Sequence, residues 1–171
     1  ETEVLVVGAG MVGVLTAHRL HSAGRKVTLI EGRRVLRGVT GHTSAKVTAQ
    51  HGGLFAHIAM SFGEPEARAH AAVHMQAIDW FDQLAGQRDF GFERTDLYLT
   101  AENEADLVDL RQEYAASIDA GLECEWLDSS KVPVPVLASV RYPDQAQIHP
   151  VRLLNGMLAD LQGNVYEGVV A

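Results

Sequence analysis

The chain has 171 residues, of which 47% are hydrophobic and 21% are charged, a balance typical of a globular protein with a sizeable core. Its formal net charge is −8 and its basic residues form no stripe, so we expect no nucleic-acid partner. No apolar run approaches the roughly 20 residues that cross a bilayer. The single cysteine, Cys124, excludes an internal disulfide and a cysteine-bound metal centre. These features favour a cytoplasmic protein without a metal site.

The first thirty residues have the pattern of a strand–helix–strand unit. Residues 4–7 are an unbroken apolar run rich in β-branched side chains, which predicts a parallel strand buried on both faces. Apolar residues recur at helical spacing over residues 14–23, and Gly24 follows where a helix commonly ends. Residues 26–30 predict a second strand, which ends at Glu31. This order predicts an α/β fold with a parallel sheet.

The turn between the first strand and the helix reads Gly8-Ala9-Gly10-Met11-Val12-Gly13, a GxGxxG pattern. In this pattern Gly8 permits the tight turn, Gly10 lets a diphosphate approach the backbone, and Gly13 lets the helix pack against the strand. The helix N-terminus offers free N–H groups and a partial positive charge to the phosphates. The alternative is a glycine turn in an α/β protein that binds no nucleotide.

Glu31 stands at the tip of the second strand, where a carboxylate can accept hydrogen bonds from both hydroxyls of a ribose. The same carboxylate would repel a 2′-phosphate, so FAD or NAD is favoured over NADP. Arg33 and Arg34 follow closely and weaken that exclusion. The alternative is a solvated strand end without a ligand.

A loop rich in small residues and hydroxyls follows the second strand. Residues 32–41 show no periodicity and predict a loop, and residues 43–50 are compatible with a short helix that Gly52-Gly53 ends. Thr43 and Ser44 can cap that helix, and their hydroxyls and amides can bond diphosphate oxygens. An ordinary capped surface helix is the alternative.

The middle of the chain predicts two helices around a pair of short strands. Residues 64–87 predict one long helix with Pro65 in its first turn, and residues 90–100 predict two short strands. Thr100 can cap a further helix whose first turn is acidic. The predicted buried stripe of the first helix is Val73, Ala77, Trp80, Phe81 and Leu84, and that of the second is Leu107, Leu110, Tyr114 and Ile118.

The last third predicts a return to alternating strands and helices. Residues 123–127 and 139–142 predict strands, whereas two prolines exclude an interior strand over residues 132–136. Residues 149–161 predict a helix, and residues 165–170 begin a last strand. The apolar face of the helix is Leu153, Leu154, Met157, Leu158 and Leu161.

Two segments together resemble a known family. The GxGxxG unit and residues 38–53, GVTGHTSAKVTAQHGG, are similar to FAD-dependent oxidoreductases of the D-amino-acid oxidase, glycine oxidase and sarcosine oxidase superfamily. Residues 38–53 and residues 144–150, DQAQIHP, look most like a bacterial branch that often carries a C-terminal Rieske domain. The GxGxxG turn is shared by many flavin and nicotinamide families, whereas residues 38–53 are much more specific. Because full members are about twice as long, and no Rieske ligand pairs occur here, we expect the chain to be an N-terminal portion.

The resemblance implies FAD as the cofactor and assigns a role to each motif. The diphosphate turn comprises Gly8, Gly10, Val12 and Gly13, with Glu31 as the ribose acceptor and Arg33 beside the adenosine. The diphosphate loop comprises Thr43, Ser44, Ala45 and Lys46, and beyond it Thr48 and Gln50 point toward the flavin. No histidine falls where some relatives attach flavin covalently, and no catalytic residue is assigned.

We therefore predict a Rossmann-like FAD/NAD(P)-binding domain interrupted by an α+β segment of a substrate domain. Residues 1–89 form the first part of the FAD-binding domain, residues 90–147 a partial substrate domain, and residues 148–171 the return to the FAD-binding domain. The resemblance implies oxidation of the CH–NH group of a small-molecule amine or amino acid, with transfer of electrons to flavin.

Two other functions stay open at this point. One is an NAD-dependent dehydrogenase with a similar first unit, and the other is a non-catalytic dinucleotide-binding fragment. His70 and His74 have the i, i+4 spacing of a metal-binding pair, but a solvated or partly buried helix face is the favoured interpretation, so we predict no metal.

Overall fold

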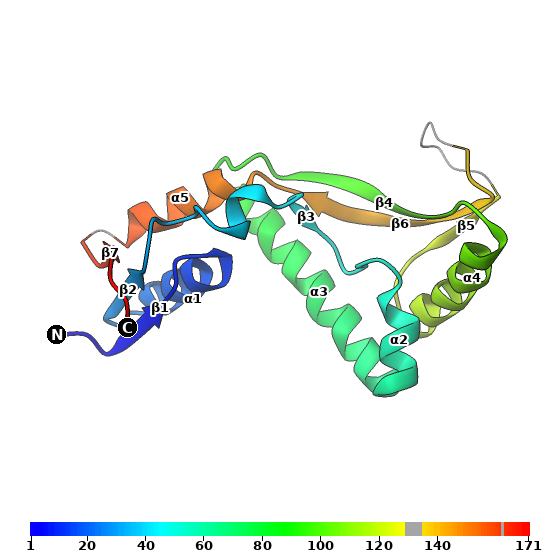
Figure 1. The fold of residues 1–171 in the computed structure, drawn as a ribbon, viewed down its shortest axis with the longest axis horizontal. Helices are drawn as coiled ribbons and strands as arrows, with labels where there is room; N and C mark the ends of the chain where they lie inside the picture. The colour runs from blue at the N-terminus through cyan, green and yellow to red at the C-terminus, as the bar shows by residue number, and fades with distance from the viewer. Residues whose placement is uncertain (129–134, 162) are drawn as a thin grey trace. The chain divides into compact units, whose positions relative to one another are not determined.

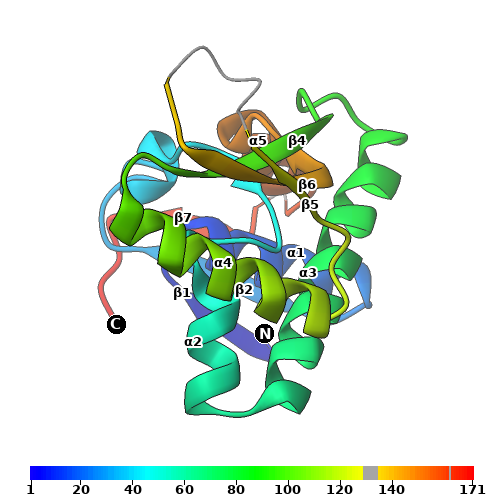
Figure 2. The same cartoon turned by 90° about the vertical axis from the view of Figure 1, so that its right-hand side faces the viewer.

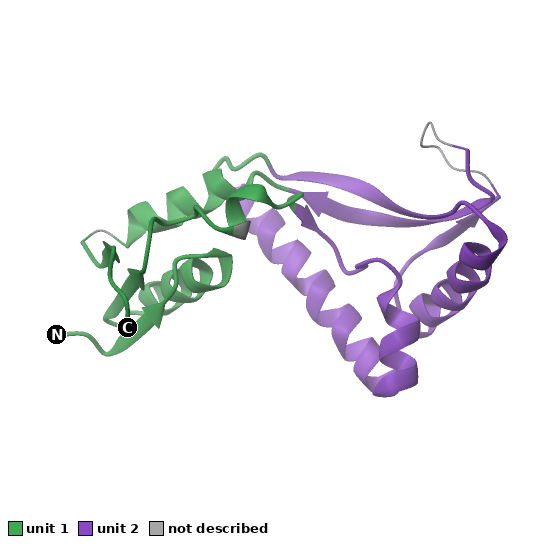
Figure 3. Cartoon of the chain, viewed as in Figure 1, with its two compact units in different colours: residues 1–45, 88–91, 148–171 green, residues 46–87, 92–147 purple. Residues whose placement is uncertain are grey.

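The computed structural model describes residues 1–128, 135–161 and 163–171, which form two compact units (Figures 1 and 3). Unit 1 comprises residues 1–45, 88–91 and 148–171; unit 2 comprises residues 46–87 and 92–147. The return to unit 1 at residue 148 coincides with a predicted domain border, whereas residues 46–87 group with the predicted substrate segment by contact. Which unit binds the cofactor and which unit binds the substrate stays a prediction.

Unit 1 contains the predicted strand–helix–strand start. Its sheet has the order β1-β2-β7 and is parallel throughout, with Val4 of β1 opposite Val27 of β2 and Leu29 of β2 opposite Val165 of β7. The mixed α/β fold with a parallel sheet is thus confirmed. The elements of this unit are β1 (Val4–Val7), α1 (Met11–Ser22), β2 (Val27–Glu31), the 3-10 helix η1 (Val39–His42), α5 (Pro150–Asp160) and β7 (Val165–Glu167).

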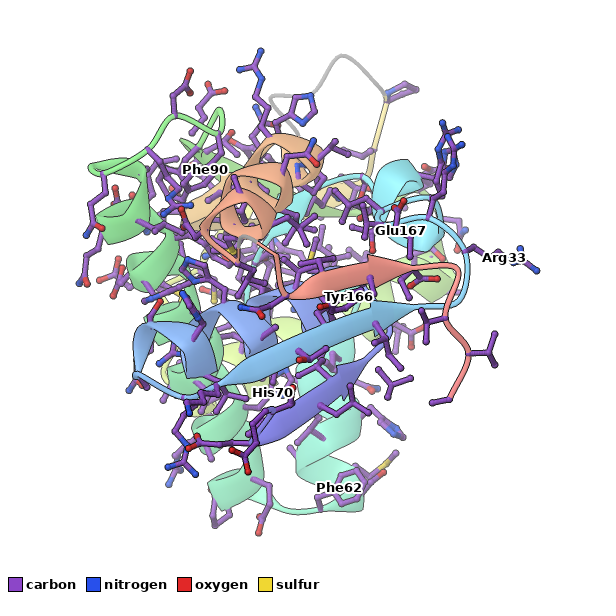
Figure 4. All side chains as sticks on the ribbon, turned by 90° about the vertical axis from the view of Figure 1, so that its left-hand side faces the viewer. Arg33, Phe62, His70, Phe90, Tyr166 and Glu167 are labelled. Carbon is purple, nitrogen blue, oxygen red and sulfur yellow. The ribbon has the colours of Figure 1, made fainter. Side chains whose placement is uncertain are left out.

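The prediction that the first strand is buried on both faces is wrong. Leu5 and Val7 are 54% and 63% exposed, because helix α1 packs its buried residues Val14 and Ala17 on one side of the sheet only. Figure 4 views the sheet from its other face, over which no helix of unit 1 lies. One face of β1 therefore has no cover within unit 1.

Helix α5 follows the sequence-based expectation closely. His149 is its N-cap and accepts the Arg152 amide through Nδ1, and Pro150 occupies the first turn. The predicted apolar face is buried at Leu153, Leu154, Met157 and Leu161.

Unit 2 is an antiparallel sheet with three helices on one face (Figures 1 and 2). Strand β4 lies along one edge of β6, and β3 and β5 pair with its other edge. The elements are β3 (Lys46–Val47), α2 (Leu54–Ser61), α3 (Glu64–Ala85), β4 (Glu93–Ala101), α4 (Glu104–Asp119), β5 (Glu125–Leu127) and β6 (Ala138–Gln147). The core between sheet and helices includes Phe55, Ala67, Ala71, Leu110, Val140 and Tyr142.

The predicted helix over residues 43–50 is wrong. Thr43 is extended, Ala45 has a φ of +62°, and residues 46–47 instead pair with the end of β6. The glycines that were expected to end a helix begin one, α2, which the sequence analysis does not predict. Its first amides, Phe55 N–H and Ala56 N–H, both donate to the carboxylate of Glu113 at 2.8 Å.

The two predicted strands over residues 90–100 are one strand, β4. Its register with β6 shifts between Thr95 and Leu97, and Asp144 on β6 has a φ of +54° there. Arg94 fixes this region to α3, since its guanidinium donates to Asp79 and Asp82 at 2.8 Å and to the Asp144 carbonyl at 2.9 Å. The irregularity is therefore a β-bulge held by charged hydrogen bonds.

The predicted buried faces of the two long helices need correction. On α3, Val73 is 62% exposed and the buried residues are Ala67, Ala71, Ile78 and Leu84. On α4, Leu110 is buried as predicted, together with the polar residues Glu113 and Ser117, whereas Ile118 is exposed. The predicted strands over residues 123–127, 139–142 and 165–170 are found as β5, β6 and β7, and most of residues 132–136 lie outside the described residues.

Across the described ranges, no helix is both long enough and apolar enough to cross a membrane.

The cap of α4 is Asn103 and not Thr100. Asn103 Oδ1 accepts the amides of Ala105 and Asp106 at 3.0 Å, and the Asp106 carboxylate accepts the Glu102 amide in return. Asn103→Ala should lower the free energy of unfolding by about 0.5–2 kcal/mol, as measured by urea denaturation. Thr100→Val, which keeps the β-branched shape, should leave it within about 0.5 kcal/mol. A larger loss in free energy of unfolding for Thr100→Val than for Asn103→Ala would instead identify Thr100 as the cap.

Candidate dinucleotide site

The glycine turn of unit 1 has a geometry that only glycine permits. Gly8 has a φ of +97°, and a Cβ on Gly13 would lie 1.8 Å from the carbonyl oxygen of Gly8. Gly13 therefore brings the first turn of α1 directly against the end of β1, the close approach that the GxGxxG pattern predicts.

The N-terminus of α1 presents unpaired amides. Its N-cap, Gly10, has no side chain to accept them, and the first turn holds no acidic residue. Among the described residues, no hydrogen bond is made by the N–H groups of Gly10, Val12 and Gly13. Val12 is 78% exposed, so this helix end is open. Free amides and the helix dipole together favour an anion at this position.

Glu31 lies at the carboxyl end of β2 beside this turn. Its Oε2 accepts the Ala9 amide and its Oε1 the Arg33 amide, both at 2.9 Å. The bond from Ala9, followed by that from Arg33, holds the pKa of the Glu31 carboxyl below its ordinary value of 4.5. Glu31 is therefore ionised at neutral pH, with acceptor capacity left on both oxygens for further donors such as ribose hydroxyls.

Arg33 donates a hydrogen bond to Glu31 through its backbone amide, while its guanidinium acts on the Glu31 carboxylate by charge alone. Figure 4 shows its side chain directed away from the protein. A second carboxylate, Glu167, is the register partner of Glu31 on β7 and accepts the Val35 amide at 2.7 Å. Two strand ends therefore hold the loop that follows β2.

Thr40 is a site residue that the sequence analysis missed. Its Oγ1 accepts the Met11 amide at 3.1 Å, so a hydroxyl from η1 reaches the first turn of α1. It lies within the segment on which the family resemblance rests, and that is the signal that could have identified it.

The next three predicted residues, Thr43, Ser44 and Ala45, follow η1 in unit 1. Thr43 Oγ1 accepts the Ala45 amide at 3.3 Å, and the carbonyl of Ala45 accepts the Ile148 amide. Thr43 and Ser44 are exposed, so their hydroxyls are open to a ligand.

The remaining predicted residues, Lys46, Thr48 and Gln50, belong to unit 2. Lys46 is exposed on β3, whereas Thr48 and Gln50 are 5% and 1% exposed. Thr48 Oγ1 donates to Gln145 Oε1 at 2.8 Å. The Gln50 amide donates to Glu113 and to the Tyr142 hydroxyl and accepts the Gly53 amide. These contacts use the polar atoms of Gln50 within unit 2 and give no support to its predicted orientation toward the flavin.

Three histidines of unit 2, His51, His70 and His74, form a cluster of rings. The centroids of His70 and His74 lie 3.9 Å apart, and those of His51 and His74 lie 5.7 Å apart. Burial, and then the neighbouring His74, lower the pKa of both His51 and His70. No group of three or more His, Cys, Asp or Glu within the described ranges is arranged to hold a metal ion.

The residues of unit 1 fit a dinucleotide. Gly13 allows the first turn of α1 to lie against the end of β1, and the amides of Gly10, Val12 and Gly13 are unpaired. The ionised carboxylate of Glu31 lies at the end of β2. These are the donors and acceptor that a diphosphate and its ribose require.

The family model that matches this chain is "DAO: FAD dependent oxidoreductase", over residues 3–171. The chain belongs to this family. The cofactor predicted from the sequence, FAD, is the cofactor of the family, which favours it over NAD. The sequence-based recognition of the D-amino-acid oxidase superfamily is confirmed.

A curated relative also bears on the predicted branch. The chain is 32% identical over 176 residues to a protein of Bacillus subtilis (strain 168) that carries the name Rieske 2Fe-2S iron–sulfur protein YhfW. The match covers 100% of this chain and 35% of the relative. Its name agrees with the predicted resemblance to a branch with a Rieske domain.

Solved structures share the fold at low sequence identity. L-proline dehydrogenase from P. horikoshii has a TM-score of 0.77 at 18% identity, over 98% of this chain and 44% of its own. Glycine oxidase from Bacillus cereus ATCC 14579 has a TM-score of 0.68 at 20% identity, over 98% and 46%. L-α-glycerophosphate oxidase from Mycoplasma pneumoniae, with FAD bound, has a TM-score of 0.72 at 19% identity, over 98% and 44%. The chain thus spans less than half the length of these proteins.

Glu31→Ala should weaken FAD binding by about 1.5–3 kcal/mol, or about 10- to 150-fold in Kd, because a charge-assisted acceptor for the ribose is lost. Fluorescence titration of FAD into the apoprotein, expressed from its full reading frame, measures this effect. Glu167→Ala is the matched control, since it removes a carboxylate that holds the same loop through Val35. Equal losses of FAD affinity in the two variants would show that Glu31 only holds the loop and does not bind the ribose.

The low pKa of Glu31 also predicts a pH dependence. Because the folded-state pKa lies below 4.5, the stability that the ionised carboxylate contributes is fully present above pH 4.5 and is lost as the pH falls through the lowered value. The difference in free energy of unfolding between wild type and Glu31→Gln should therefore be constant from pH 7 to 5 and shrink below 4.5. Urea denaturation at pH 7, 5 and 4 measures it, and a difference that shrinks already above pH 5 contradicts the assignment.

Proposed function

We propose that the protein is an FAD-dependent oxidoreductase that oxidises the CH–NH group of an amine or amino acid, with transfer of electrons to the flavin. The family match supports the flavin, and similar structures are named for proline, glycine and amino acids. The single observation in this chain that carries the proposal is the open N-terminus of α1 with the ionised Glu31 beside it.

The residues that would hold FAD follow from this geometry. The amides of Gly10, Val12 and Gly13 would bind the diphosphate, with Thr43 and Ser44 adding hydroxyls. Glu31 would accept the ribose hydroxyls, and its charge would disfavour a 2′-phosphate. When bound, FAD would accept one hydride equivalent, which carries two electrons, from the carbon next to nitrogen; with loss of the N–H proton to solvent this leaves an imine that water hydrolyses.

The substrate, the electron acceptor and the role of each unit are also part of the proposal. We propose that residues 1–45 and 148–171 bind the cofactor and that residues 92–147 bind the substrate. A cytoplasmic location and the absence of a nucleic-acid partner stay predictions from composition and charge.

The test is the visible spectrum of the protein expressed from its full reading frame. We expect oxidised-flavin absorbance, and anaerobic bleaching by at least one member of a panel of glycine, L-proline, D-alanine and simple secondary amines. Glycerol 3-phosphate belongs in the panel, because a glycerophosphate oxidase shares the fold. Bleaching by glycerol 3-phosphate alone contradicts the amine assignment, and a colourless protein that quenches NADH fluorescence contradicts the flavin assignment.

The same spectrum recorded on residues 1–171 alone tests the non-catalytic alternative. A chain that retains FAD but is not bleached by any substrate of the full protein binds the cofactor without completing the site.

A further inference from the structure

Three histidine rings lie where helix α3 meets the start of helix α2 in unit 2. His70 and His74 are one turn apart on α3, and their ring centroids lie 3.9 Å apart. His51, in the loop before α2, meets His74 edge-on with 5.7 Å between the centroids. Phe55, in the first turn of α2, meets His70 edge-on at the same distance. The contact between the two helices therefore includes rings whose charge depends on pH.

The hydrogen bonds of this cluster suit neutral rings. His70 Nε2 is buried and has no hydrogen-bond partner in the part of the chain that the structure describes. A protonated imidazole donates through both nitrogens, so a charged His70 would bury an N–H without an acceptor, whereas the neutral ring can carry its proton on Nδ1. His74 Nδ1 donates to the His70 carbonyl at 2.9 Å, so the His74 ring gains charge only at Nε2. A charged His70 ring would therefore have to leave its buried position.

The charged groups that act on these rings are all basic. His74 and Lys46 act on His51, and His74 and His51 act on His70. No carboxylate of the described residues is among them. A proton gained by one ring therefore disfavours a proton on the next.

Carboxylates on the neighbouring elements are directed elsewhere. Glu66, one turn before His70 on α3, has a carboxylate oxygen beside Gly63, and the other acids of α3 form ion pairs with arginines. Glu113 of α4 accepts the first amides of α2. The titratable residue of α2 itself, His57, is exposed.

We propose that His51, His70 and His74 form an acid-sensitive contact, which holds α3 against the start of α2 while the rings are neutral and opens when they gain protons. This inference goes beyond the proposed function and does not rest on it. Protons on two neighbouring rings place like charges in direct contact. His51 is exposed, so its ring can turn into water, whereas the Nε2 of His70 reaches water only if α3 separates from the start of α2.

The contact is present at neutral pH and is lost in acid. Loss of water around the ring, and then the charge of His74, hold the pKa of both His51 and His70 below the ordinary value of 6.5. Below that pH the closed form thus binds fewer protons than the open form. The stability that the neutral rings contribute is fully present above pH 6.5 and is lost as the pH falls through the lowered values.

Hydrogen–deuterium exchange of the protein expressed from its full reading frame tests the contact. The protection factors of residues 68–76 on α3, which are corrected for the intrinsic exchange rate, should fall by about tenfold between pH 7.5 and 5.5. A proton bound by the open form alone shifts the opening equilibrium by about this factor one pH unit below 6.5. Helix α4 contains no histidine, so residues 104–119 should keep their protection, which separates local opening from global unfolding.

Phenylalanine at the three positions keeps aromatic rings in the contact and removes their charge. In the triple variant His51→Phe, His70→Phe, His74→Phe the protection of residues 68–76 should be the same at both pH values. His57→Phe is the matched control, since it removes an exposed histidine of α2, and it should keep the fall seen in the wild type.

Three outcomes overturn the proposal: equal protection at the two pH values in the wild type, a fall that persists in the triple variant, and a fall that disappears in His57→Phe. If the triple variant does not fold, exchange of the ring C2 hydrogen of His70 in the wild type decides by its pH midpoint. A midpoint below 6.5 supports the contact, and a midpoint at or above 6.5 overturns it.

Discussion

The amides at the N-terminus of α1 lie beside the carboxylate at the carboxyl end of β2, and together they suit an anion and the sugar next to it. Unpaired amides at Gly10, Val12 and Gly13 carry the positive end of a helix dipole. The Glu31 carboxylate beside them is held in its ionised form by two backbone amides. Gly13 permits the close approach of α1 to the end of β1, because a single added carbon would collide with the carbonyl of Gly8.

Local chemistry made this site predictable from the sequence. An apolar strand, a glycine turn, a helix and a second strand follow one another within about thirty residues, and each is decided by its own side chains. The α5 helix was predictable for the same reason, since its apolar face and its proline lie within one short segment. The family assignment also needed the specific sequence of residues 38–53.

Non-local contacts explain what the sequence analysis missed. Residues 46–47 form a strand because residues 146–147, about one hundred positions later, offer an edge to pair with. Helix α2 begins where it does because Glu113, far along the chain, accepts its first amides. Two of the four buried residues of α3 are alanines, Ala67 and Ala71, whose small side chains gave a weaker signal than Trp80 and Phe81. Thr40 reaches Met11 across 29 positions, a contact that spacing alone does not reveal.

We propose that FAD is bound at the open end of α1, and a crystal structure of the FAD-loaded protein tests this most directly. It should place diphosphate oxygens within about 3 Å of the amides of Gly10, Val12 or Gly13, and the adenosine ribose on the carboxylate of Glu31. A nucleotide bound elsewhere, with these amides facing protein or solvent, would contradict the account.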